Sequence, residues 1–114
     1  MSTTTDTDNQ RFEMLKRLVS DLGPLRRGSV VKRFMPCGKQ GCCCQARPPQ
    51  LHGPYYQWTR KIRGKTVTVR LTEQEAQRIR EWIANGRQLD RIVTEMEKLS
   101  LRMTERLLRQ RMPA

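Results

Sequence analysis

Acidic residues are absent from a long central stretch of this 114-residue chain. Residues 26–72 contain eleven Lys and Arg but no Asp or Glu, while aromatic residues make up only 5% of the sequence. With a hydrophobic fraction of 36%, the chain has material for one small core. No apolar run approaches the roughly 20 residues of a membrane span, and residues 1–10 lack the apolar core of a signal peptide. We therefore expect a cytoplasmic protein without a membrane segment.

The residue combinations of common enzymes are also missing. The sequence has a single histidine, no glycine-rich phosphate loop of the Walker type and no Ser–His–Asp set. The acid-free segment lacks the clustered carboxylates that a metal-dependent nuclease needs. The seven carboxylates after residue 72 are spaced to pair with Lys and Arg on a helix surface. We expect no enzymatic activity.

All four cysteines and the histidine lie within residues 37–52. Thiolate sulfur and imidazole nitrogen are ligands that tetrahedral Zn²⁺ prefers. Adjacent cysteines point in different directions, so Cys42 and Cys44 reach one ion more easily than a pair that includes Cys43. The pattern predicts a structural zinc site with Cys43 as a spare thiol and, as ligands, Cys37, Cys42, Cys44 and His52.

Two other interpretations of the cysteines stay open, namely a pair of disulfides and a reactive redox thiol. The lack of an export signal argues against disulfides. Catalytic zinc is disfavoured, because four protein ligands leave no position for water and no acidic residue lies nearby to act as a base. A structural metal suits a chain whose core is so small.

Hydrophobic periodicity predicts an N-terminal helix over residues 10–23, after a disordered tail of residues 1–9. The apolar face of this helix comprises Phe12, Leu15, Leu18, Val19 and Leu22. A basic zinc-knuckle β-domain over residues 26–72 follows, with a first strand at residues 29–35. Residues 54–62 and 65–71 flank Arg63-Gly64, which is a tight hairpin signal. In that register Trp58 faces Val69 on a mostly apolar face, whereas Tyr55, opposite Thr72, lies on a polar face.

The sequence Thr72-Glu73-Gln74-Glu75 is a capping box that opens a C-terminal helical segment over residues 73–112. Asn85-Gly86 either ends or weakens this helix. Beyond it, steps of three and four residues form a coiled-coil seam of about two heptads, made by Leu89, Ile92, Met96, Leu99 and Met103. Since the seam is too short to be stable alone, we expect it to pair with the first helix or with a second copy of the chain.

The expected fold is therefore α+β: a zinc-stapled antiparallel sheet of about three strands, an N-terminal helix and a long C-terminal helix. The electrostatic repulsion within a segment as basic as residues 26–72 is best relieved by a polyanion, and a β-ribbon fits the major groove of DNA. Tyr55 either stacks on a base or shields the zinc loop, and Trp58 belongs to the core. The candidate nucleic-acid-binding residues are Arg26, Arg27, Lys32, Arg33, Lys39, Tyr55, Arg60, Lys61, Arg63, Lys65 and Arg70.

Several short motifs occur in the same order as in a known family: Gly28-Ser29-Val30, Cys37-Gly38-Lys39 with Cys42 and Cys44, His52-Gly53-Pro54-Tyr55-Tyr56, and Gly64-Lys65-Thr66. Over residues 26–100 the chain resembles an uncharacterised family of small bacterial and archaeal zinc-binding domains with a CGK-x-x-C-x-C…HGPYY signature. The resemblance implies the same four metal ligands, and Cys43 falls where the family accepts any residue. Members are often encoded near transposases or recombinases, which implies work on mobile-element DNA with such an enzyme as a partner.

Two functional hypotheses follow. The first is a zinc-stabilised accessory protein that binds nucleic acid, DNA rather than RNA, and that forms a homodimer through the C-terminal helix. The second is a protein–protein adaptor that docks on an acidic partner through the basic sheet or the Leu89–Met103 seam. Binding through phosphate contacts weakens steeply with salt, whereas docking through the helix does not, so salt dependence separates the two.

Overall fold

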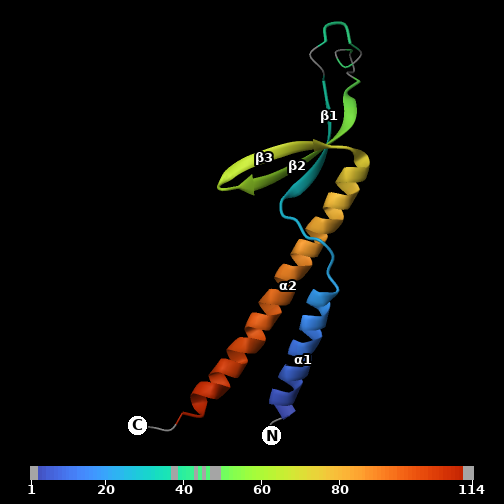
Figure 1. The fold of residues 1–114 in the computed structure, drawn as a ribbon. Helices are drawn as coiled ribbons and strands as arrows, with labels where there is room; N and C mark the ends of the chain where they lie inside the picture. The colour runs from blue at the N-terminus through green and yellow to red at the C-terminus, as the bar shows by residue number, and fades with distance from the viewer. Residues whose placement is uncertain (1–2, 37–38, 43, 45, 47–49, 112–114) are drawn as a thin grey trace. The chain divides into compact units, whose positions relative to one another are not determined.

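A computed structural model describes residues 3–36, 39–42, 44, 46 and 50–111 of the protein. The element order is α1 (Thr3–Ser20), β1 (Ser29–Met35), β2 (His52–Ile62), β3 (Lys65–Leu71) and α2 (Glu73–Arg109), as Figure 1 shows. The strands form one antiparallel sheet in the order β1-β2-β3. The expected α+β class, with one helix before a three-stranded sheet and a long helix after it, is confirmed.

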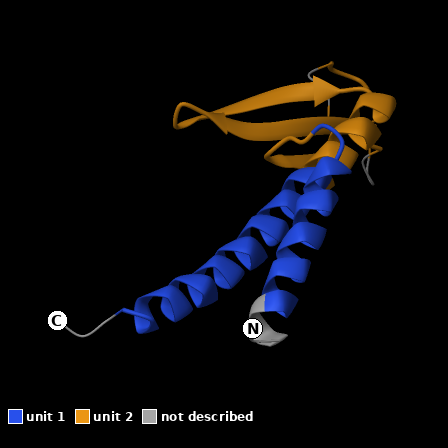
Figure 2. Cartoon of the chain, turned by 60° about the horizontal axis from the view of Figure 1, so that its bottom comes forward, with its two compact units in different colours: residues 1–24, 85–114 blue, residues 25–84 orange. Residues whose placement is uncertain are grey.

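The chain divides into two compact units (Figure 2). The helical unit comprises residues 1–24 and 85–114, and the sheet unit comprises residues 25–84. This division differs from the expected succession of four segments, because the helical unit is assembled from both ends of the sequence. The sheet unit is thus inserted between the two halves of the helical unit, and α2 contributes residues to both.

The β2–β3 hairpin has the register that its alternation predicts. Trp58 pairs with Val69, and Arg60 pairs with Val67. Arg63 and Gly64 have φ angles of 52° and 79°, as a two-residue hairpin turn requires. The expected pairing of Tyr55 with Thr72 is absent from the ladder, because β3 ends at Leu71 and Thr72 caps α2 instead.

The two faces of the sheet differ in burial. Tyr56 and Trp58 of the central strand are buried, and Val67 and Leu71 on the same face are half-buried. On the opposite face, β1 and β3 present exposed side chains throughout. This second face, called the open face below, carries Val31, Arg33, Tyr55, Gln57, Thr59, Lys61, Thr66, Thr68 and Arg70.

The start of α2 is fixed by the predicted capping box. The Glu75 amide donates to the Thr72 hydroxyl (3.1 Å), and the Thr72 amide donates to a Glu75 carboxylate oxygen (2.8 Å). Ala76 and Ile83 in the following turns are buried, which is the pattern of a helix that packs on one face only. The capping box is confirmed.

In the helical unit, α1 and the second part of α2 lie side by side and antiparallel (Figures 1 and 2). Their core comprises Leu15, Ile92 and Leu99, with Phe12, Leu22 and Met96 packed against it. The seam residues of α2 therefore pack against α1 of the same chain, one of the two partners expected for them. Leu18 and Val19 of the expected apolar face are instead 37% exposed.

Helix α1 begins at Thr3, so the expectation of a disordered tail over residues 1–9 and a helix from Gln10 was wrong. The buried Asp8 accounts for the longer helix, since it accepts hydrogen bonds from Arg102 and forms an ion pair with Arg106. Each of the nearest contacts in these pairs is 2.9 Å. Arg11 likewise forms a bidentate pair with Glu95, at 2.6 and 2.9 Å.

Helix α2 continues through Asn85-Gly86, the position at which the sequence allowed an end. The Asn85 side chain donates to the Pro24 carbonyl at 2.7 Å, and Gly86 is buried. The helix therefore tolerates a glycine in its interior, although glycine has a low helix propensity. None of the described helices combines the length and the apolar character that crossing a bilayer requires.

Candidate metal centre and cationic surface

Three of the predicted zinc ligands lie together. The potential ligand atoms of Cys42, Cys44 and His52 all lie within 4.8 Å of one another. The Cys42 sulfur is 2.9 Å from His52 Nε2, and Cys44 is only 3% exposed. In a tetrahedral zinc site, sulfur and nitrogen ligands are separated by about 3.6 Å, given ordinary bond lengths. A small outward movement of one side chain would therefore accommodate an ion, and the three residues lie close enough to hold one.

Local backbone structure brings these three residues together. Cys42 follows a turn in which its amide donates to the Lys39 carbonyl at 3.4 Å. His52 begins β2 and pairs with Met35, beyond a register shift between Arg33 and Met35. The expected strand start at Pro54 was therefore two residues late.

Gly53 makes this pairing possible, because the β1 backbone passes very close to it. A side chain at Gly53 would place its Cβ 2.8 Å from the Arg33 carbonyl oxygen and 2.9 Å from a Phe34 ring carbon. Its φ of 146° is also unfavourable for a residue with a side chain. The glycine therefore allows His52 to sit beside the end of β1.

Two cysteines of the predicted set, the ligand Cys37 and the spare thiol Cys43, lie outside the described residues. The described part of the chain thus supplies three of the four expected ligands.

Four of the predicted nucleic-acid-binding residues line one hollow of about 320 Å³. This cationic hollow is lined by Leu25, Arg26, Arg27, Arg60, Lys61 and Ile62. None of these lining residues is acidic. The structure thereby brings together cations from the segment before β1 and from the end of β2.

A second group of predicted residues lies on the open face. Arg33 is directly opposite Tyr55 on neighbouring strands. The Arg70 guanidinium lies over the Tyr55 ring, 4.4 Å from its centre. The open face therefore combines cations and an aromatic ring with hydroxyl and amide groups, among them the paired hydroxyls of Thr59 and Thr68 (3.0 Å).

The remaining predicted cations are not gathered at one place. Arg63 and Lys65 are exposed at the β2–β3 turn, whereas Lys39 precedes Cys42 at the opposite end of the sheet (Figure 1). Lys32 alternates onto the other face from Arg33 and lies 5.8 Å from the Phe34 ring centre. A single flat surface that carries all eleven residues is therefore not formed.

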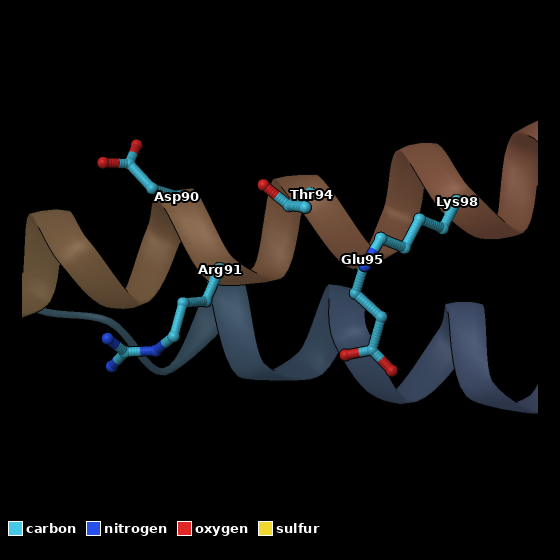
Figure 3. Close-up of a pocket in the computed structure, with 5 residues that line it drawn as sticks. All are labelled: Asp90, Arg91, Thr94, Glu95 and Lys98. Carbon is cyan, nitrogen blue, oxygen red and sulfur yellow. The ribbon is translucent and has the colours of Figure 1, made fainter.

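A larger groove, of about 530 Å³, runs along α2 in the helical unit (Figure 3). It is lined by Asp90, Arg91, Thr94, Glu95 and Lys98. These side chains carry both signs of charge, and Glu95 extends toward α1, where it is already paired with Arg11. The groove therefore offers no preference for one class of ligand.

Sequence reasoning missed the stacking around Trp58. The Arg26 and Arg60 guanidiniums lie 4.8 and 3.9 Å from its ring centre. The Trp58 indole N–H donates to the Arg27 carbonyl at 2.9 Å. Trp58 was assigned to the core, and it is 8% exposed. The placement of Arg60 on the same face as Trp58, two residues away, was the available signal.

Comparison with known proteins gives one result. The chain matches the Domain of unknown function (DUF6788) over residues 8–81. None of the curated proteins and none of the solved structures that were compared with the chain matches it. Because the matched residues make up more than half of the sequence, the protein belongs to the DUF6788 family.

Proposed function

We propose that this protein is a zinc-stabilised nucleic-acid-binding accessory protein, with DNA as the preferred partner. The cationic surface of the sheet unit carries the proposal. Residues 26–72 contain no acidic residue, and their cations line a hollow, the open face and an exposed turn. Such a surface repels itself unless a polyanion neutralises it.

Zinc is the metal that best suits the Cys42–Cys44–His52 cluster, because two thiolates and an imidazole are its preferred donors. Cys37 would complete the tetrahedron. We assign the ion a structural role: it would join the β1–β2 connection to the start of β2. The cations at the other end of the sheet would then be held in position before nucleic acid binds.

The adaptor hypothesis is less well supported. Ile92 and Leu99, the central seam residues proposed to meet a partner protein, are 3% exposed because α1 covers them. Leu101, Leu107 and Leu108 are between 50% and 66% exposed along the end of α2. We place the proposed homodimer contact at these leucines rather than at the seam.

The resemblance to a family encoded near transposases and recombinases supports a setting in mobile-element DNA. A protein of this kind would assist a transposase or recombinase by holding element DNA, with no catalytic step of its own.

Replacing both turn cations tests nucleic-acid binding. We expect Arg63→Glu with Lys65→Glu to weaken binding of a labelled duplex by at least tenfold, since two attractive phosphate contacts become repulsive. Fluorescence anisotropy between 50 and 300 mM salt measures the affinity and its salt slope. The control is Arg109→Glu with Arg111→Glu, which changes the net charge equally in the helical unit. Equal affinities of wild type and the turn variant would remove this proposal.

A further inference from the structure

The residues of the cationic hollow are held in place by contacts with other residues of the sheet unit. Trp58 holds three of its residues: the Arg26 and Arg60 guanidiniums lie over the indole ring, and the indole N–H donates to the Arg27 carbonyl. The Arg26 amide also donates to the Trp82 carbonyl at 3.0 Å, which fixes the segment before β1 against α2 within the sheet unit. The cations are therefore positioned by contacts that do not involve a ligand.

The backbone at Gly28 brings this segment against β2. A Cβ at Gly28 would lie 2.3 Å from the Thr59 carbonyl oxygen and 2.9 Å from Trp58 Nε1. Only glycine permits this approach, and its φ of 106° likewise favours glycine. Arg27 is thereby held beside the end of β2, where Arg60 and Lys61 lie.

The charge of the hollow indicates that an anion belongs there. Four of its six lining residues are cations, and the other two, Leu25 and Ile62, are apolar. Four like charges around one hollow repel one another, and no acidic side chain of the lining offsets this repulsion. An anion with several acceptor oxygens would relieve it.

We infer that the cationic hollow binds the terminal phosphate of a nucleic-acid strand, an inference that rests on the proposed nucleic-acid binding. A terminal phosphate monoester carries a charge of about −1.5 to −2 and three acceptor oxygens, whereas each phosphate inside a strand carries a single charge. Four cations around one hollow match the greater charge. An internal phosphate has a nucleoside on both sides and suits an exposed strand, whereas a strand end can enter a hollow.

Two oligonucleotides that differ only at the end test the inference. One carries a 5′-phosphate and the other a 5′-hydroxyl, each with a fluorophore at the 3′ end. A second pair carries the fluorophore at the 5′ end and differs by a 3′-phosphate or a 3′-hydroxyl. We expect the protein to bind one phosphorylated oligonucleotide about tenfold more tightly than its hydroxyl counterpart, as charge-assisted hydrogen bonds to a phosphate allow. This ratio should shrink between pH 7.5 and pH 5, because the second phosphate ionisation has a pKa of about 6.

Arg27→Ala with Lys61→Ala is the informative variant. Both side chains line the hollow and are exposed, and neither stacks on Trp58, so the sheet should stay folded. The affinity ratio should fall to about one. The matched control, Arg63→Ala with Lys65→Ala, removes the same charge outside the hollow; it should weaken both oligonucleotides and keep the ratio. Circular dichroism melting verifies that each variant is folded.

The outcomes separate this inference from the proposed function. If the phosphorylated and hydroxyl members of each pair bind with equal affinity, the hollow does not recognise a terminal phosphate, although nucleic-acid binding stands. If no oligonucleotide binds, the proposed function fails, and titration with a 5′-mononucleotide then tests the hollow by itself. Mononucleotide binding that Arg27→Ala with Lys61→Ala abolishes supports a phosphate site, whereas the absence of binding overturns it. A glutamate-rich peptide that competes as well as the mononucleotide would identify the hollow as a carboxylate site and overturn the inference.

Discussion

At the scale of single residues, the candidate metal centre depends on one small residue, Gly53, as well as on the residues that could bind the metal. Cys42, Cys44 and His52 have the donor atoms, but Gly53 determines whether His52 reaches them. The backbone of β1 occupies the space that any side chain at position 53 would need. The centre is therefore sensitive to a residue that donates nothing to it.

Gly53→Ala should destabilise the sheet unit by roughly 2–4 kcal/mol, through an unfavourable φ and a clash with the Arg33 carbonyl. The matched control is Gly64→Ala in the hairpin turn. Its φ is also positive, but a Cβ there meets nothing within 4 Å, so we expect a cost of about 1 kcal/mol. Thermal melting with saturating zinc compares the two variants. Equal melting temperatures would show that the close contact at Gly53 is unimportant.

Residue types also explain which part of the site was predictable. The spacing of Cys42, Cys44 and His52 indicated their grouping, since thiol and imidazole ligands close together have few other uses. The cationic hollow was not foreseen, although all four of its cations were candidates. Its formation depends on two guanidiniums that stack on Trp58 and on a close approach at Gly28, and neither contact follows from local periodicity.

At the scale of elements, the hairpin and the capping box followed from the sequence because both are local. Alternation fixed the register of β2 and β3, and Thr72 with Glu75 fixed the start of α2. The start of α1 did not follow, because its first turns are held by residues that lie 94 and 98 positions away in the sequence, Arg102 and Arg106. Residues 3–9 have little apolar character, so periodicity gave no sign of this contact.

The pairing of α1 with α2 should weaken in acid. Hydrogen bonds from Arg102, and then from Arg106, hold the pKa of the Asp8 carboxyl below its usual value. The stabilisation from this group is therefore fully present above the ordinary carboxyl pKa of about 4 and is lost as the pH falls through the lower folded value. Helix melting followed by circular dichroism should show this loss in wild type.

Asp8→Asn should lower the melting temperature of the helices at pH 7 and reduce their sensitivity to pH below 4. Asp6→Asn is the control, since Asp6 is an exposed acid two residues earlier in the same helix. An Asp8→Asn variant with the acid response of wild type would assign that response to other carboxylates.

At the scale of the whole molecule, the two units differ in what stabilises them. The helical unit combines its small apolar core with ion pairs to the buried Asp8. The sheet unit also has a small core, and its buried side chains among the described residues include the candidate metal ligand Cys44. A structural metal compensates for such a small core, because its binding energy appears as folding energy.

Removing the metal should therefore affect the sheet unit first. In reducing buffer, a zinc chelator should lower the melting temperature of the strand signal by roughly 10 °C or more and abolish oligonucleotide binding. Native mass spectrometry before and after chelation should show the loss of one zinc ion per chain and report the number of subunits. Protein that is purified without metal yet melts cooperatively, with unchanged strand signal, would contradict a structural zinc site.

Because the sheet unit is inserted in the sequence between the two halves of the helical unit, loss of the metal should also destabilise the helices. Residues 25–84 separate the two halves of the helical unit, and while they are folded their ends stay close, with Arg26 bonded to Trp82. Once unfolded, they become a long flexible loop that α1 and α2 must close, at an entropic cost of about 3–4 kcal/mol. A chelator that never approaches the helices should thus lower their melting temperature, which makes helix stability a remote reporter of zinc occupancy.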